Sequence, residues 1–480
     1  MIHLRMLTLA HVNYHELRCL LTLKDFFFII QQLKTFKIQS TSFNGLDRDR
    51  LVVLQKIFTQ MPKLRVCQVP LIDVNDFDDL KPSACLEEFS LDYGTMACLD
   101  RLLNYIPNVQ SLTVRVYTDL QHFSKQITTK SSSVINSSLK YLQISTINNI
   151  PFSQIEDFFQ SRFPRLNTLK FFFKTDASSQ SCLDYIDDQR WQSLLQSFIS
   201  LQHFHCCIEL PIPFDITLNL FETNEYFRQK NWTFTSEIYT YSFNRILRFH
   251  TNPYLKQRLD IIPSKAFAVN NNIYSCVRDL RILIDTIPND LPKNGSALLY
   301  PNVMSLTLIS NKSFHEQSFL LYLYSIIDYK HLRYLTVQLD NCSRFFLLSL
   351  IEKYSQISSF TLSTYHSWSK LISLSSQLSK RHICSLTVYE IFRDFTPYHS
   401  IHQLFHRLQI LSICLSSIDD CYRFLTLLFI GSQQTTVEQL RSLTIKCDFD
   451  EPDMIANWIR SNILRKLSYK CTTSVLLIWL

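Results

Sequence analysis

A six-residue pattern of apolar and polar positions recurs along the chain: apolar, two variable residues, apolar, polar, apolar. It reads LRMLTL at 4–9, LRYLTV at 332–337 and LRSLTI at 440–445. Alternate side chains of a β-strand face opposite sides, so the fourth and sixth positions share one face and the fifth position faces the other. The pattern therefore predicts a short strand with one apolar face and one polar face.

The pattern occurs sixteen times, in two series whose copies lie 22–35 residues apart. The fifth position is polar in every copy, from Thr8 to Ser468. Self-similarity at such a period is typical of repeat architectures. The first positions of the copies are Leu4, Leu33, Leu64, Leu86, Val109, Leu139, Leu166, Leu201, Val277, Val303, Leu332, Ile357, Ile383, Leu408, Leu440 and Leu464.

Segments with helical spacing of apolar residues lie between the predicted strands. They are 46–60, 96–105, 154–163, 189–198, 318–329, 344–354 and 419–429. Four prolines (Pro62, Pro107, Pro164 and Pro301) each stand two residues before a copy of the pattern, where they end the preceding helix. The sequence thus predicts an α/β solenoid: a curved horseshoe with parallel strands inside and helices outside. The alternative is a doubly wound α/β domain, but sixteen strands are too many for one open sheet.

The repeats divide the chain into an N-terminal array at 1–206 and a C-terminal array at 273–480. The segment between them, 207–272, carries no clear repeat but is rich in aromatic residues and contains two β-prone stretches, 232–241 and 245–251. Two interpretations remain open for it. It is either a modified pair of repeats whose aromatic residues form a binding platform, or a structural segment, namely diverged repeats or a β-hairpin that seals the core, and the structural interpretation is favoured.

Composition and charge exclude several classes of protein. The chain is 46% hydrophobic with only 4 Gly, and its net charge of +7 comes from scattered Lys and Arg, so we expect no nucleic-acid partner. No apolar run is long enough for a membrane span, and the N-terminus does not read as a secretory signal. The 14 cysteines lie mostly at apolar positions without a CxxC pair. We expect a monomer in the cytoplasm, with the nucleus as the alternative compartment.

The sharpest chemical candidate is the string His203-Phe-His205-Cys206-Cys207. His203, His205 and Cys207 would share one strand face and could contribute zinc ligands, but no fourth ligand lies nearby. Exposed polar positions of a repeat explain them better. The sequence contains no GxSxG elbow and no glycine-rich phosphate loop. We therefore predict no catalytic residues, no metal and no cofactor, and hence a protein that is not an enzyme.

The LxxLxL core with one helix per unit resembles the leucine-rich repeat family. The strings 106–112 and 163–169, the aromatic stretch 231–254 and the ending 475–480 resemble F-box/leucine-rich-repeat proteins. That resemblance implies a substrate receptor of cullin-type ubiquitin ligases, although no F-box is recognisable in the chain. The asparagine or cysteine that usually follows the strand is mostly replaced, for example by Val12 and Gly94, which predicts uneven curvature.

These observations favour a non-enzymatic protein-binding scaffold, namely a substrate-recognition or adaptor protein of ubiquitin ligase pathways. The alternative is a free-standing leucine-rich-repeat scaffold or inhibitor with no link to a ligase. Partners are expected on the concave strand surface. The candidate partner-binding residues are Glu87, Glu88, Tyr334, Tyr389, Arg441, Lys446 and Lys470. The basic residues among them could contact an acidic segment of the partner, or they could simply solvate the sheet.

Overall fold

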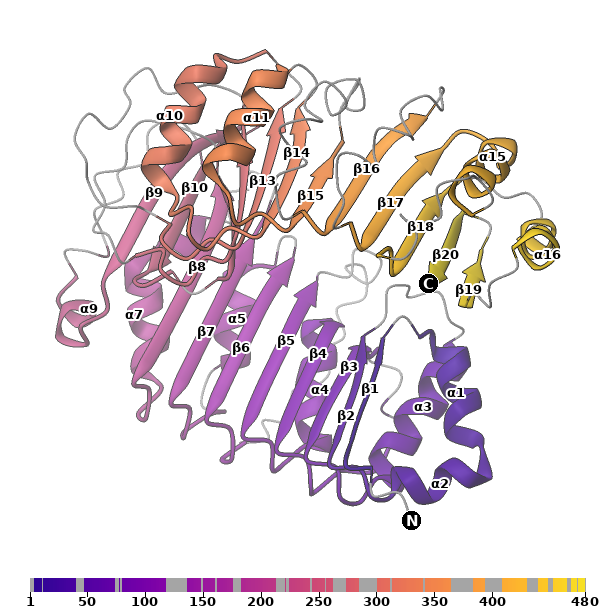
Figure 1. Cartoon of the computed structure of the whole chain (residues 1–480). Coiled ribbons are helices and arrows are strands. Elements are labelled where there is room, and N and C mark those ends of the chain that lie inside the picture. The colour runs from indigo at the N-terminus through magenta and orange to yellow at the C-terminus, as the bar shows by residue number, and fades with distance from the viewer. Residues whose placement is uncertain are drawn as a thin grey trace. The chain divides into compact units, whose positions relative to one another are not determined.

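The computed structural model describes most of the chain. The described residues are 4–10, 12–39, 47–73, 77, 80–117, 136–147, 150–159, 162–175, 183–212, 221, 224–241, 244–254, 256–261, 273–284, 300–310, 313–339, 342–363, 383–392, 408–429, 439–447, 452–463, 468–472 and 474–479. They form two compact units, Met1–Asn252 and Pro253–Leu480. Each unit is α/β and contains one large, mostly parallel sheet (Figure 1).

The sheet of the first unit runs in chain order through eight parallel strands and ends in an antiparallel hairpin. The hairpin's second strand, β10, lies between β8 and β9. The strands are β1 (Met6–Ala10), β2 (Thr35–Gln39), β3 (Val66–Leu71), β4 (Glu88–Gly94), β5 (Ser111–Tyr117), β6 (Tyr141–Ile147), β7 (Thr168–Lys174), β8 (His203–Pro211), β9 (Phe234–Tyr241) and β10 (Asn244–Thr251).

Helices follow several of these strands in the chain and lie on one side of the sheet, as α4, α5 and α7 show in Figure 1. Side-chain caps fix where several of them begin: Asn13 forms a capping box with Glu16, and Thr95 and Asp187 accept from amides of the first turn. The helices are α1 (Tyr14–Thr22), α2 (Lys24–Ile30), α3 (Asp47–Gln60), α4 (Met96–Tyr105), α5 (Phe152–Phe159), α7 (Asp188–Gln196) and α9 (Glu225–Gln229).

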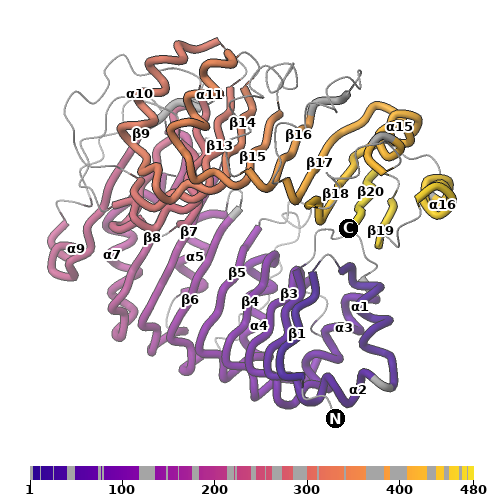
Figure 2. The backbone as a smooth tube through the Cα atoms, in the orientation of Figure 1, coloured from indigo at the N-terminus to yellow at the C-terminus, as the bar shows by residue number. Residues whose placement is uncertain are grey.

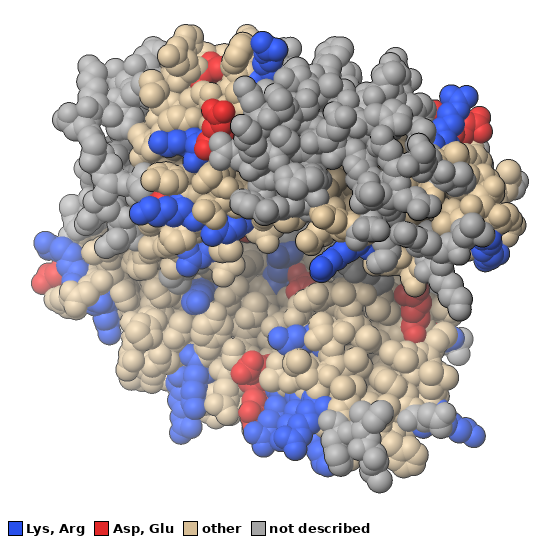
Figure 3. Space-filling model, in the orientation of Figure 1, with Lys and Arg blue, Asp and Glu red and all other residues tan. Residues whose placement is uncertain are grey.

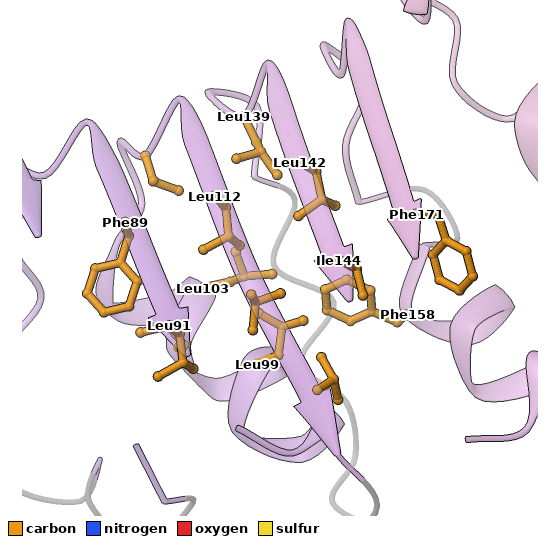
Figure 4. Close-up of a cluster of buried hydrophobic side chains, with 14 of the residues drawn as sticks. Phe89, Leu91, Leu99, Leu103, Leu112, Leu139, Leu142, Ile144, Phe158 and Phe171 are labelled. Atoms are coloured by element: carbon orange, nitrogen blue, oxygen red, sulfur yellow. The ribbon is translucent and has the colours of Figure 1, made fainter. Parts of the chain in front are cut away.

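The core of the first unit lies between the sheet and these helices. Figure 4 shows the fourth-position residues Leu112 and Leu142 and the sixth-position residue Ile144 in one buried cluster with the helix residues Leu99 and Phe158. Leu112 and Leu142 have no exposed surface. The predicted apolar face of the strand pattern is therefore confirmed as the core face.

The second unit repeats the topology of the first: eight parallel strands in chain order, followed by a hairpin whose second strand, β20, lies between β18 and β19. Figure 2 shows the strands of each unit succeeding one another side by side. The strands are β11 (Arg258–Ile261), β12 (Asp279–Leu283), β13 (Ser305–Ser310), β14 (Tyr334–Leu339), β15 (Ser359–Leu362), β16 (Ser385–Phe392), β17 (Ile410–Leu415), β18 (Ser442–Lys446), β19 (Ser468–Cys471) and β20 (Val475–Trp479). The helices are α10 (Glu316–Ile326), α11 (Arg344–Lys353), α15 (Ile418–Phe429) and α16 (Pro452–Asn462).

A hydrogen-bond arrangement recurs where the parallel strands begin. The carbonyl of the residue at the second position of a repeat accepts from two consecutive amides of the next repeat. Arg5 O, for example, accepts from Lys34 N at 2.8 Å and Thr35 N at 3.1 Å. In the second unit, Arg333 O accepts from Ser358 N and Ser359 N in the same way. Because both lone pairs are used, the strand starts are held in one register without any side chain.

The structure differs from the sequence expectations at the last predicted repeat. The copy at Leu464 was expected to add a parallel strand with Ser468 at its outward fifth position. Residues 464–467 lie outside the described residues, and β19, which begins at Ser468, pairs antiparallel with β20 instead. Period-two alternation is the same in parallel and antiparallel strands, so the pattern could not separate the two.

The segment 207–272 contains elements of both units. Its first residues complete β8, and β9 and β10 form a hairpin whose Phe234 and Phe249 stack with ring centroids 5.1 Å apart, both buried. Strand β11, further along, pairs parallel with β12. This strand was missed because Lys256 occupies the first position of its repeat, where the pattern requires an apolar residue.

Candidate functional site

The candidate site is the face of each sheet opposite to the core, which we call the outward face. The fifth positions of the repeats stand there in register. In the first unit they form one row, Thr8, Lys37, Gln68, Ser90, Thr113, Gln143, Lys170 and His205. None of these eight residues is buried. The structure thus confirms the polar face that alternation predicts.

The corresponding row of the second unit begins with Asp260 and Arg281 and continues as a lane of hydroxyl groups. The hydroxyl lane consists of Thr307, Thr336, Thr361, Thr387, Ser412 and Thr444, with each residue paired to the next across the sheet. Because neighbouring strands are about 4.8 Å apart, successive hydroxyls have about that spacing. Such a lane offers hydrogen-bond donors and acceptors but no acid, base or nucleophile of altered reactivity.

A pocket of about 380 Å³ opens on this outward face at β11–β14. Its lining is almost wholly polar: Arg258, Asp279, Leu280, Arg281, Ser305, Thr307, Thr336 and Gln338. Two of these side chains are guanidinium groups and one is a carboxylate. The sequence pattern had placed Arg281 on the outward face but gave no reason to single it out, because the pocket also requires Arg258 from the missed strand β11.

Two of the predicted site residues, Lys446 on β18 and Tyr389 on β16, are brought together. The Lys446 ammonium lies 4.6 Å from the centroid of the Tyr389 ring, a cation–π contact. Between them, on β17, Cys414 is the cross-strand partner of Lys446. Burial raises the pKa of the Cys414 thiol and the Lys446 charge opposes that rise. The three side chains form one cluster on the outward face.

Three other predicted residues of the second unit lie apart from that cluster. Tyr334 is 51% exposed at the start of β14. Arg441 precedes β18 and is exposed, and Lys470 is exposed on β19, where it pairs with Leu477 of β20. The hairpin therefore places Lys470 in the hydroxyl lane, in line with Thr444, by a pairing that the sequence did not predict.

The predicted acidic pair of the first unit is divided between two places. Glu87 precedes β4 and its carboxylate lies 3.5 Å from Arg65, with both side chains largely in solvent. Glu88 is exposed on the outward face. Further along β4, burial raises the pKa of Asp92, and the Arg115 charge and a hydrogen bond with Gln68 oppose that rise.

The two histidines of the zinc candidate, His203 and His205, lie on the outward face, but the described residues place no set of ligands around them. Among the described residues, no group of three or more His, Cys, Asp or Glu side chains could hold a metal ion. Burial, together with the positive charges of Lys170 and His203, lowers the pKa of His205 to about 4. His205 therefore stays neutral near pH 7.

A buried ionic cluster occupies the hairpin end of the first sheet. Arg248 of β10 donates to Glu209 of β8 at 3.0 Å and to Glu237 of β9 at 3.3 Å, and Lys174 lies 3.8 Å from Glu209. Arg248 is 1% exposed. Burial raises the pKa of Glu237, although Arg248 opposes the rise. The cluster pairs its charges internally, so it holds three strands together rather than presenting them to a ligand.

The remaining chemistry of the described residues offers no activated nucleophile. Burial raises the pKa values of the Cys67, Cys206 and Cys421 thiols, which disfavours the thiolate. Over the face seen in Figure 3, Lys and Arg form small separate groups rather than one broad basic patch. None of the helices in the described part of the chain is long and apolar enough to cross a membrane.

Comparison with known proteins adds no relative. No protein-family profile matches the sequence, and no curated protein is detectably similar to it. The geometry of the outward faces is therefore the main basis for assigning a function.

Proposed function

We propose that this chain is a non-enzymatic protein-binding scaffold, built as an irregular solenoid of strand–helix repeats. The observation that carries the proposal is the alignment of polar fifth-position side chains on the outward face of both sheets, none of them buried. The strand order within each unit follows the chain, and the bonds at the strand starts recur from repeat to repeat, as stacked units require. The outward faces are long, hydrogen-bonding surfaces suited to an extended polypeptide partner.

Within this proposal, the resemblance to F-box/leucine-rich-repeat proteins favours a substrate-recognition or adaptor role in ubiquitin ligase pathways. A free-standing scaffold or inhibitor is the second candidate. The two candidates share the binding surface and differ only in whether a cullin-ligase adaptor joins the complex.

The test is affinity capture with the full chain carrying Thr361→Arg, compared with the wild type and with Glu352→Arg. Thr361 lies in the middle of the hydroxyl lane, whereas Glu352 is exposed on α11. Partners that are lost with Thr361→Arg and retained with Glu352→Arg bind the outward face, as proposed. Equal capture by all three proteins contradicts the proposal. A cullin-ligase adaptor in the eluate decides for the ligase role, and its absence from an eluate that contains outward-face partners decides for the free-standing scaffold.

A further inference from the structure

The pocket on β11–β14 contains an arginine, Arg281, whose guanidinium group is only partly satisfied. Arg281 is partly buried, its Nε atom is inaccessible to solvent, and that nitrogen has no hydrogen-bond partner among the described residues. No ion pair within the described part of the chain includes Arg281. The Arg281 side chain nevertheless lines the pocket, so a ligand there can pair the guanidinium charge that the described residues leave unpaired.

The neighbours of Arg281 define what such a ligand would be. Arg281 pairs across the sheet with Thr307, and Thr336 follows Thr307 in the same row. A guanidinium group presents a planar fork that matches a carboxylate, and the hydroxyls can donate to the same oxygens. The pocket therefore has the donors for a carboxylate.

Two carboxylates limit the charge that the ligand can carry. Asp279 lines the pocket two residues before Arg281, and Asp260 of β11 is the cross-strand partner of Arg281. Arg258, the second arginine, is already engaged with Asp260 at 3.4 Å. A run of acidic residues would be repelled by these aspartates. A ligand segment with one acidic residue and uncharged or basic neighbours fits these charges, because its carboxylate can face Arg281 while Asp279 faces a cation or water.

We propose that the Arg281 pocket binds the carboxylate of one isolated Asp or Glu side chain in an extended segment of a partner protein. The inference rests on the proposed scaffold function and gives it a specific contact. Its location differs from the Lys446–Tyr389 cluster, which lies on strands further along the sheet.

The experiment pans a randomised library of displayed peptides against the immobilised full chain and measures the affinity of each enriched peptide in solution. The variants are Arg281→Met, which removes the fork, and Arg281→Lys, which keeps the charge but loses the bidentate geometry. Arg278→Met is the matched control, because Arg278 is an exposed arginine three residues earlier whose guanidinium contacts the Asn302 carbonyl outside the pocket. Thermal unfolding checks that each variant is folded.

The expected result is a family of peptides with one acidic residue. Their affinity falls about tenfold to a hundredfold with Arg281→Met, which corresponds to loss of a charged hydrogen bond. Arg281→Lys gives an intermediate loss and Arg278→Met less than about a twofold change. Replacing the acidic residue of the peptide by its amide causes the same loss with the wild type but no further loss with Arg281→Met.

Four outcomes of the peptide experiment overturn the inference. They are enrichment of peptides without an acidic residue, equal losses for Arg281→Met and Arg278→Met, no enrichment at all, and displacement of the peptide by free glutarate at equal concentration. The last would assign the pocket to a small carboxylate rather than to a partner segment. Partners lost through Thr361→Arg but insensitive to Arg281→Met would overturn this inference and leave the scaffold function standing. If Thr361→Arg and Arg281→Met both retain every partner, the pocket inference and the scaffold function are both overturned.

Discussion

Two arginines on the outward faces, Arg248 in the first unit and Arg281 in the second, carry the same charge in opposite surroundings. Arg248 is almost fully buried and donates to two carboxylates. Arg281 is partly exposed in a pocket, and no ion pair within the described residues includes it. This difference shows that a charged side chain on the outward face is not by itself evidence of a binding site. A charge that is already satisfied stabilises the fold, whereas one left unsatisfied is available to a ligand.

The hairpins that end the two sheets extend this comparison. Strands β10 and β20 occupy equivalent places: β10 lies between β8 and β9, and β20 lies between β18 and β19. The outward residues Arg248 and His250 of β10 are each 1% exposed, whereas Trp479 of β20 is 47% exposed. The same topology thus carries a buried polar cluster in one unit and an accessible surface in the other.

The largest expected effect is a loss of folding stability on replacement of Arg248, which tests whether its ion pairs stabilise the fold. Arg248→Met leaves Glu209 and Glu237 buried without their shared cation, so we expect the free energy of unfolding to fall by about 3–5 kcal/mol. Arg281→Met, in which no ion pair is broken, should cost less than about 1 kcal/mol. Urea unfolding followed by circular dichroism measures both. Equal losses for the two variants would show that Arg248 has no special structural role.

The two carboxylates of the cluster should differ from each other. Glu209 contacts both Arg248 and Lys174, so Glu209→Gln should cost about 1.5–3 kcal/mol. Within the described residues, Glu237 forms an ion pair with Arg248 alone, and its Oε1 atom is buried without a hydrogen bond. Glu237→Gln should cost about 1 kcal/mol or less, because one carboxylate still pairs with Arg248. The reverse order would contradict the geometry.

The pH dependence of Glu237→Gln gives an independent check. Burial raises the pKa of Glu237 in the folded protein above its ordinary value of 4.5. The folded state therefore binds this proton more tightly than the unfolded state does. The resulting stabilisation is fully present below pH 4.5 and is lost as the pH rises through the raised pKa. Unfolding curves across this range should show that decline in the wild type and not in Glu237→Gln.

A smaller pH effect is expected from His205, at the edge of the outward row of the first unit. Its pKa is lowered from 6.5 to about 4 in the folded protein, so the unfolded chain binds the proton more readily between these values. Stability should therefore fall as the pH falls from about 6.5 to about 4, and this contribution should not change below that. His205→Gln should make the fall in melting temperature shallower. An unchanged pH profile would show that His205 is well solvated.

The sequence could predict the repeat, the buried fourth and sixth positions and the outward fifth positions, because these depend on local alternation alone. The register confirms this from Thr8 to His205 in the first unit and from Arg281 to Thr444 in the second. Helix positions were also predictable within a few residues. For example, α4 covers the predicted 96–105.

The buried cluster and the pocket could not be predicted, because both depend on which strands pair. Arg248 meets Glu209 only because β10 inserts beside β8, across 39 residues of sequence. The pocket includes Arg258 of β11, a strand whose apolar pattern is broken at Lys256. Strand pairing between distant segments is set by tertiary packing, which the periodicity of a single strand does not contain.

The smallest expected effect concerns the contact between Lys446 and Tyr389. An exposed cation–π contact contributes about 0.5–1 kcal/mol, so a double-mutant cycle with Lys446→Met and Tyr389→Leu should give a coupling energy in that range. The control cycle pairs Tyr389→Leu with Lys470→Met. Lys470 lies on β19, which β17, β18 and β20 separate from β16, so its coupling with Tyr389 should be close to zero. A coupling energy of about 0.5–1 kcal/mol would show that the Lys446 charge, like that of Arg248, is already satisfied within the fold. Zero coupling in both cycles would show that the Lys446 charge, like that of Arg281, remains available to a partner.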